Sequence, residues 1–178
     1  MGASSDVDGW NLGPPRKALV MMGVAGTGTR TVARLLARHL TASYIDVRDM
    51  APDHREPFPG PLSRWLSERR RDGVFAVATC PALTRRHRDL LRSGDPGLYF
   101  IHLSAGRDLL VRRVRRLRDA TAAALLEAQL AELEPLHDDE EGVVIDATAT
   151  PAELVQRILA VVSALVPAPE HPDRPMVT

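Results

Sequence analysis

Short aliphatic segments alternate along the chain with longer stretches in which apolar residues recur every three or four positions. The short segments are apolar on both faces, which is typical of strands inside a parallel sheet. The longer stretches are typical of helices that cover such a sheet. We predict strands at residues 18–23, 43–46, 75–79, 98–103 and 143–146, and helices at residues 30–40, 62–71, 84–92, 107–118, 120–133 and 151–165. This alternation predicts an α/β fold in which helices flank a five-stranded parallel sheet in three layers.

The two ends of the chain lack this periodicity. Residues 1–16 hold Gly, Ser, Asp and Pro, and residues 167–178 are rich in proline and charge. Both are predicted to be disordered tails, which leaves residues 17–166 as one domain. Residues 50–61 contain four prolines and one glycine and are predicted to form a loop.

The composition narrows the classes of function. The 23 basic residues balance 23 acidic ones, so no overall charge favours nucleic acid or an anionic membrane surface. No apolar run reaches the ~20 residues that a membrane-spanning helix requires, and no secretory signal is present, so we expect a cytoplasmic protein. The single cysteine, Cys80, lies in a strand-like segment and is predicted to be a buried free thiol rather than a nucleophile.

The most informative segment is the glycine-rich stretch after the first predicted strand. It reads Gly23-Val-Ala-Gly26-Thr-Gly28-Thr-Arg-Thr31 and leads directly into a predicted helix. Glycines there let backbone N–H groups converge on a phosphate, and the helix N-terminus adds partial positive charge. The order of strand, loop and helix therefore predicts a P-loop. Its predicted phosphate-binding residues are Gly23, Gly26, Gly28, Thr29, Arg30 and Thr31.

Two positions depart from the P-loop pattern G-x-x-x-x-G-K-[ST]. Thr29 stands in place of the lysine that contacts the β- and γ-phosphates, and Arg30 in place of the hydroxyl that binds magnesium. The single lysine, Lys17, precedes the strand and is expected at the opposite end of the sheet. We expect the loop still to bind an anion, with most of the side-chain charge supplied by Arg30. The alternative is that Arg30 points to solvent and the loop only caps a helix.

Three further segments make the chain resemble the gluconate kinases, small P-loop kinases of the nucleoside-monophosphate-kinase-like group. They are residues 44–50 (Tyr-Ile-Asp-Val-Arg-Asp-Met), residues 80–92, which begin Cys-Pro-Ala-Leu-Thr, and residues 125–136. The resemblance covers residues 18–165. It implies the strand order 2-3-1-4-5, a ligand crevice at the carboxyl ends of the strands, an anionic small molecule or nucleotide as ligand, ATP as cofactor and a homodimer. The lost hydroxyl argues against bound Mg²⁺.

The resemblance also implies that Asp46 and Asp49, after the second strand, face substrate and metal as candidate catalytic residues. The family reads D-G-D-D-L-H there, and Arg48 puts a positive charge where a carboxylate would help. Much of the substrate-binding stretch that follows in the family has no counterpart between Asp49 and Trp65. Part of the expected gluconate pocket is therefore missing.

Four arginines are candidates for binding substrate or closing a lid. After the third strand the family reads C-S-A-L-K, and Pro81 and Thr84 replace its serine and lysine. A planar guanidinium fork suits a carboxylate or phosphate, and a solvated helix face is the alternative for such arginines. The family's lid has arginines followed by H-F-M, which Asp119-Ala-Thr121 replaces here. The candidates are Arg85 and Arg88 near the substrate, and Arg112 and Arg116 in the lid.

These departures favour a gluconokinase-like protein that is impaired as an ATP:gluconate phosphotransferase and that binds an anionic or nucleotide-like ligand or acts through a protein partner. One alternative is an active small-molecule kinase in which Arg30 and the lid arginines take over the electrostatic work. Another is a different small-molecule enzyme on the same scaffold, because a fold does not determine chemistry.

Overall fold

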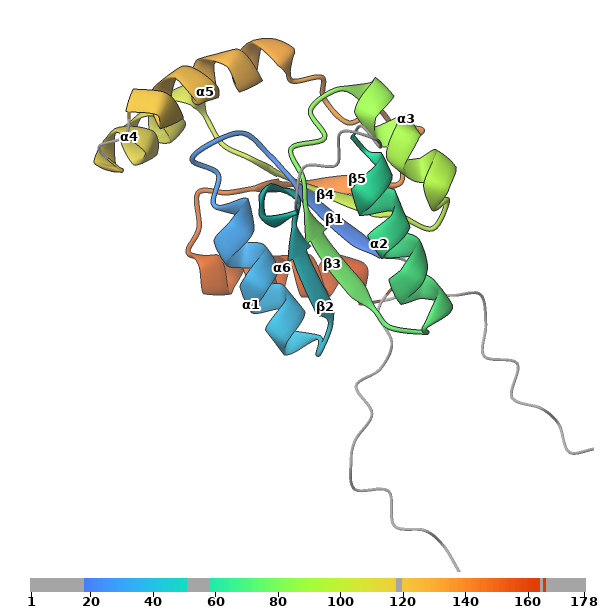
Figure 1. Cartoon of the computed structure of the whole chain (residues 1–178). Helices are drawn as coiled ribbons and strands as arrows, with labels where there is room; N and C mark the ends of the chain where they lie inside the picture. Colours follow the sequence, from blue (N-terminus) through green and yellow to red (C-terminus); the bar gives the residue numbers. More distant parts are fainter. Residues whose placement is uncertain (1–17, 51–57, 118–119, 164, 166–178) are drawn as a thin grey trace, which may run out of the picture.

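A five-stranded parallel sheet forms the centre of the protein (Figure 1). The computed structural model describes residues 18–50, 58–117, 120–163 and 165. The strands are β1 (Leu19–Met22), β2 (Ser43–Asp46), β3 (Ala76–Thr79), β4 (Tyr99–Ser104) and β5 (Gly142–Asp146). Their order is β2-β3-β1-β4-β5, which confirms the predicted fold and strand order. Because β1 lies between β3 and β4, the loop that follows it opens at the middle of the carboxyl edge.

The described residues form six α-helices and one short 3₁₀ helix. They are α1 (Thr29–His39), η1 (Val47–Asp49), α2 (Gly60–Arg71), α3 (Arg85–Gly94), α4 (Arg107–Arg116), α5 (Ala120–Glu132) and α6 (Pro151–Val162). Helices α1 and α6 cover one face of the sheet, and α2 and α3 cover the other. Helices α4 and α5 lie beyond the carboxyl ends of the strands, near the loop that joins β1 to α1 (Figure 1).

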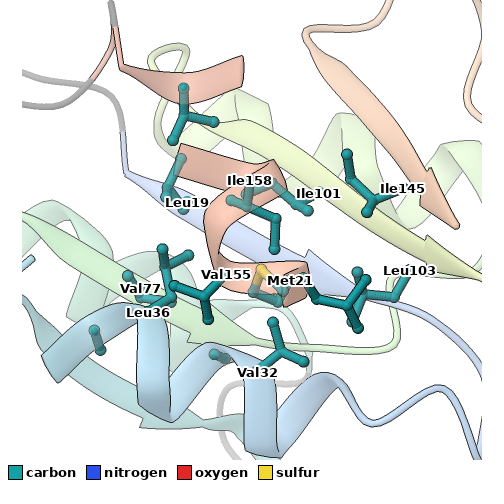
Figure 2. Close-up of a cluster of buried hydrophobic side chains, with 14 of the residues drawn as sticks. Leu19, Met21, Val32, Leu36, Val77, Ile101, Leu103, Ile145, Val155 and Ile158 are labelled. Carbon is teal, nitrogen blue, oxygen red and sulfur yellow. The ribbon is translucent and has the colours of Figure 1, made fainter. Parts of the chain in front are cut away.

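Alternating residues of β1 supply two aliphatic cores, as the period of a strand requires. Leu19 and Met21 pack against α1 and α6 in the cluster that Figure 2 shows. Val20 and Met22 face α2 and α3. A third cluster joins Val24, in the loop after β1, to buried residues of α4 and α5. The two helices are thereby held against the loop.

A few boundaries differ from the prediction. Helix α2 begins at Gly60, so Pro61 lies in its first turn, where the missing N–H of proline leaves no hydrogen bond unmade. The predicted loop at residues 50–61 is therefore shorter, and its residues 51–57 lie outside the described residues. The predicted tails, Lys17 and Asp119 lie outside them too. None of the described helices combines the length and the apolar character needed to span a membrane.

Candidate functional site

The loop after β1 has a backbone that requires glycine. A Cβ atom on Gly23 would lie 2.7 Å from the carbonyl oxygen of Leu103, which is too close for any side chain. Gly26 has a φ of 88° and packs against α4, where a Cβ atom would lie 3.1 Å from Val114 Cγ2. Gly28 also has a positive φ and is the N-cap of α1, which begins at Thr29. Strand, loop and helix therefore follow one another as a P-loop requires.

A cavity of about 580 Å³ opens beside this loop, within the size range of small-molecule sites. The predicted loop residues Gly23, Gly26, Gly28, Thr29, Arg30 and Thr31 all line it. The ends of β2 and β3 contribute Asp46, Thr79 and Cys80, and Arg48 of η1 lies next to them. Helices α4 and α5 complete the wall with Arg113, Leu117, Leu125 and Gln129. The cavity lies at the carboxyl ends of the strands, where the ligand crevice was predicted.

Two arginines hold Asp46, the carboxylate at the end of β2. Arg30 Nε donates to Asp46 Oδ2 at 2.8 Å, and Arg30 Nη2 donates to Asp49 Oδ1 at 2.6 Å. Arg48 donates its Nη2 to Asp46 Oδ2 at 2.8 Å and its Nε to Asp46 Oδ1 at 3.0 Å. Arg30 therefore neither points to solvent nor aims its whole charge at the loop. This geometry argues against the expectation that Arg30 supplies most of the side-chain charge to an anion.

The environment of Asp46 keeps it ionised. Burial alone would raise the pKa of Asp46, but hydrogen bonds from Arg48, Thr79 and Arg30 outweigh burial and hold the pKa well below its usual range. A carboxylate with so low a pKa is a poor proton acceptor near neutral pH. Asp46 and Asp49 both accept a hydrogen bond from Arg30, so the structure brings these two candidates together as partners of an arginine.

Cys80, at the end of β3, is another residue that lines the cavity. Burial raises the pKa of its thiol to about 12, so the sulfur stays protonated at neutral pH. Cys80 is free and buried, which confirms the prediction made for it.

On the α4 side the arginine that contacts the loop is Arg113, which was not among the candidates. Its Nη1 donates to the carbonyl of Gly26 at 3.3 Å, and its Nη2 donates to the carbonyl of Ala147 at 2.9 Å. Arg112 and Arg116 are exposed and do not line the cavity, so the structure does not bring them to the site. The helical pattern carried no signal for this contact, because both carbonyl partners of Arg113 are distant in sequence.

A second residue that sequence reasoning missed is Gln129 of α5. Its Oε1 accepts a hydrogen bond from the backbone N–H of Ala25 at 2.7 Å. One N–H of the loop is thus occupied by the protein itself. Gln129 lies inside the segment that carries the family resemblance, which was the available signal.

Arg88 lies outside the cavity and is fully buried. Its Nε and Nη2 form an ion pair with both carboxylate oxygens of Glu140 at 2.7 and 2.8 Å. Its Nη1 and Nη2 also donate to four backbone carbonyls, those of Ala82, Leu83, Glu134 and Pro135. We therefore correct its role from substrate binding to holding the segment before β5 against α3.

Arg85 is likewise engaged away from the cavity. Its Nη1 and Nη2 donate to the two carboxylate oxygens of Asp139 at 2.8 and 2.6 Å. Thr84, which stands where the family has a lysine, accepts a hydrogen bond from the backbone N–H of His87 and so caps α3. The structure therefore places neither residue beside the loop.

The Arg88–Glu140 pair leads to a prediction about acid stability. Burial would raise the pKa of Glu140, but hydrogen bonds from Arg88, His137 N–H and Arg92 lower it to about 2. A lowered pKa adds stability above the ordinary value of 4.5, and this stability is lost as the pH falls from 4.5 toward 2. We expect the free energy of unfolding, measured in urea, to fall over that window. Glu140→Gln should be less stable at neutral pH and should show a shallower fall, and an unchanged slope would contradict the assignment.

Several known proteins similar to this chain are gluconokinases. The chain is 31% identical to a gluconokinase of Gluconobacter oxydans (strain 621H), in an alignment of length 164 that covers 83% of this chain and 92% of that protein. It is also 31% identical to the thermoresistant gluconokinase of Escherichia coli (strain K12) over 71% of this chain and 82% of that one. The chain belongs to the gluconokinase family. No protein-family model matches it.

Solved structures agree with this membership. The unliganded structure of a sugar kinase from Janibacter sp. HTCC2649 superposes with a TM-score of 0.72 at 30% identity, over 86% of this chain and 100% of that one. A gluconokinase from Sinorhizobium meliloti 1021 superposes with a TM-score of 0.70 at 26% identity, over 86% and 95% of the two chains.

Proposed function

We propose that this protein binds an anionic, phosphate-containing ligand in the loop cavity and that it is impaired as an ATP:gluconate phosphotransferase. The observation that carries the proposal is the occupation of Asp46 by Arg30 and Arg48. In a working kinase the lysine and hydroxyl of the loop would act on the phosphates and the metal, and Thr29 and Arg30 stand in those two positions.

Anion binding has its own support. Among the described residues that line the cavity, Asp46 is the single acidic one, whereas Arg30, Arg48 and Arg113 give three permanent positive charges. The N-terminus of α1 adds the partial charge of a helix dipole at Thr29. The net field in the cavity therefore favours an anion. Because the relatives are named as gluconokinases, nucleotides and phosphorylated sugar acids are the first ligands to try.

A second candidate is an active small-molecule kinase with rearranged catalytic groups. Arg48 and Arg113 favour it, because arginines beside a transferring phosphoryl group stabilise the charge of the transition state. Turnover measurements separate the two candidates.

A single position tests anion binding. Thr29→Glu places a carboxylate in the first turn of α1, where it interacts favourably with the helix dipole by about 0.3–1 kcal/mol and so should not unfold the protein. The same carboxylate should repel a phosphate from the loop. We expect the affinity for pyrophosphate or ADP, measured by titration calorimetry with and without magnesium, to fall by at least about tenfold.

Thr29→Gln is the matched control, because it has the same length without the charge and should bind within a few-fold of wild type. If the wild-type protein binds neither probe at millimolar concentration, the proposed function is wrong and the loop only caps α1. Equal binding by the Glu and Gln variants would show that the probes bind elsewhere.

A further inference from the structure

The residues at the end of β2 do not fit a magnesium ion. Each oxygen of Asp46 accepts two N–H bonds: Oδ2 from Arg30 and the Arg48 side chain, and Oδ1 from the backbone and side chain of Arg48. A carboxylate has about four acceptor sites, so Asp46 has none left for a cation. Asp49 is paired with Arg30 as well. Among the described residues no group of three or more acidic, His or Cys side chains is placed to hold a metal.

Guanidinium groups occupy the place where a kinase of this fold would need the metal. Mg²⁺ prefers carboxylate, carbonyl and water oxygens, and an arginine offers none. Arg30 replaces the hydroxyl of the loop, and Arg48 covers Asp46 from the adjoining turn. Arg30 and Arg48 balance the charges of Asp46 and Asp49, so this cluster offers a divalent cation no net negative charge.

Arg48 is well placed to contact a ligand. Its side chain lines the cavity and remains 62% exposed, against 39% for Arg30. Among the described residues, the Arg48 side chain donates hydrogen bonds to Asp46, through Nε and Nη2. These two bonds fix the plane of the guanidinium group. An oriented guanidinium loses little freedom when it binds a phosphate, so its hydrogen bonds to the ligand should be effective.

On the basis of the proposed anion-binding function, we propose that the cavity binds a diphosphate-type group without magnesium, and that Arg48 together with Arg30 supplies the charge that the metal provides in P-loop kinases. The diphosphate could belong to inorganic pyrophosphate or to a nucleoside diphosphate. Both present the same two phosphoryl groups to the loop and the arginines.

Magnesium should therefore compete with the protein rather than assist it. A magnesium ion that chelates a diphosphate lowers its net charge and occupies the oxygens that Arg48 and Arg30 would contact. We expect pyrophosphate and ADP to bind at least as tightly in EDTA as in millimolar magnesium, as measured by titration calorimetry. Tighter binding of ADP than of pyrophosphate would identify the nucleoside diphosphate as the better ligand, and the reverse would identify free diphosphate.

Arg48→Gln is the decisive variant. The substitution removes the positive charge of Arg48 and the two hydrogen bonds that its side chain donates to Asp46. Binding in EDTA should therefore weaken by about tenfold or more. Arg38→Gln is the matched control, because Arg38 is an exposed arginine in the last turn of α1 and does not line the cavity. The control should bind as wild type does. Thermal melts of both variants verify that they fold.

A second variant acts in the opposite direction. Asp46→Asn removes the carboxylate that neutralises Arg30 and Arg48, so it should tighten pyrophosphate binding in EDTA by about threefold or more. In a site that needs a metal, the same substitution would weaken binding.

The outcomes separate this inference from the proposed function. Binding that requires magnesium would overturn the inference and leave the proposed anion site in place. Binding that Arg48→Gln leaves unchanged, or that Asp46→Asn weakens in the folded protein, would also overturn it. If wild type binds neither probe in either condition, the proposed function fails together with the inference.

Discussion

Purified protein supplied with ATP, magnesium and gluconate is expected to phosphorylate gluconate no faster than a blank reaction. Removal of one preorganised group that stabilises a transition state costs about 10²–10³ in rate. Here the loop lysine and the magnesium-binding hydroxyl are both replaced, by Thr29 and Arg30. The third defect lies in Asp46, which the two arginines hold and which is therefore unavailable to metal or substrate. An ordinary kinase has a kcat of about 1–100 s⁻¹. Rate losses of this size, acting together, would lower the turnover to that of the blank reaction.

Thr29→Lys by itself should not restore turnover. The new lysine would return one charge to the loop, but Arg30 and Arg48 would still occupy Asp46. A gluconokinase of the family, assayed in parallel by coupled detection of ADP, is the positive control. Wild-type turnover within about tenfold of ordinary kinase rates would refute the proposed impairment and favour the active kinase with rearranged groups. A large gain from Thr29→Lys would show that the lysine was the only defect.

Arg88→Met is expected to destabilise the protein by about 3–5 kcal/mol, the usual cost of removing one partner from a buried ion pair. The side chains of Arg88 and Glu140 are both 0% exposed, so Glu140 would keep a buried charge with Arg92 as its one remaining side-chain partner among the described residues. Four backbone carbonyls would also lose a donor. The measurement is urea unfolding at neutral pH, in which the midpoint should fall with an unchanged slope.

Arg85→Met is the matched control for Arg88→Met. Arg85 lies three residues earlier, on the same helix, and also pairs with a carboxylate through two short bonds, but Asp139 is 65% exposed. Exposed pairs contribute about 0–1 kcal/mol, so this variant should unfold almost as wild type does. Equal losses for the two variants would mean that burial does not distinguish them. The double variant Arg88→Met/Glu140→Met should be more stable than Arg88→Met, because no unpaired charge remains.

The sequence alone predicted the elements and the loop correctly because these depend on short-range patterns. Residues that are apolar on both faces can form a buried parallel strand, and each predicted strand is found within one or two residues of its range. The glycine spacing predicted a phosphate loop for a similar reason, because Gly23 and Gly26 sit where a Cβ atom would clash or strain the backbone. The strand order came from the family resemblance and not from the pattern, since pattern says nothing about which strands pair.

The roles of the arginines were the least predictable part. The roles of Arg30 and Arg88 depend on acidic partners that are distant in sequence: Asp46 lies 16 residues from Arg30, and Glu140 lies 52 residues from Arg88. An amphipathic pattern shows that an arginine avoids the apolar face of its helix, but not whether it meets solvent, a carboxylate or a ligand. For this reason the sequence wrongly predicted substrate binding for Arg88, which is buried in an ion pair with Glu140. It also failed to select Arg113, which contacts the loop.

What the sequence by itself determined is the α/β class, the position of the phosphate loop, and the loss of its lysine and hydroxyl, because these are properties of residue type and local spacing. The tertiary structure decided which charges meet. By bringing the start of α1 to the end of β2, it placed Arg30 on Asp46, which Arg48 of the adjoining turn also holds. The strength of an ion pair depends on the distance between its two charges. For residues far apart in the sequence, such as Arg30 and Asp46, folding sets that distance.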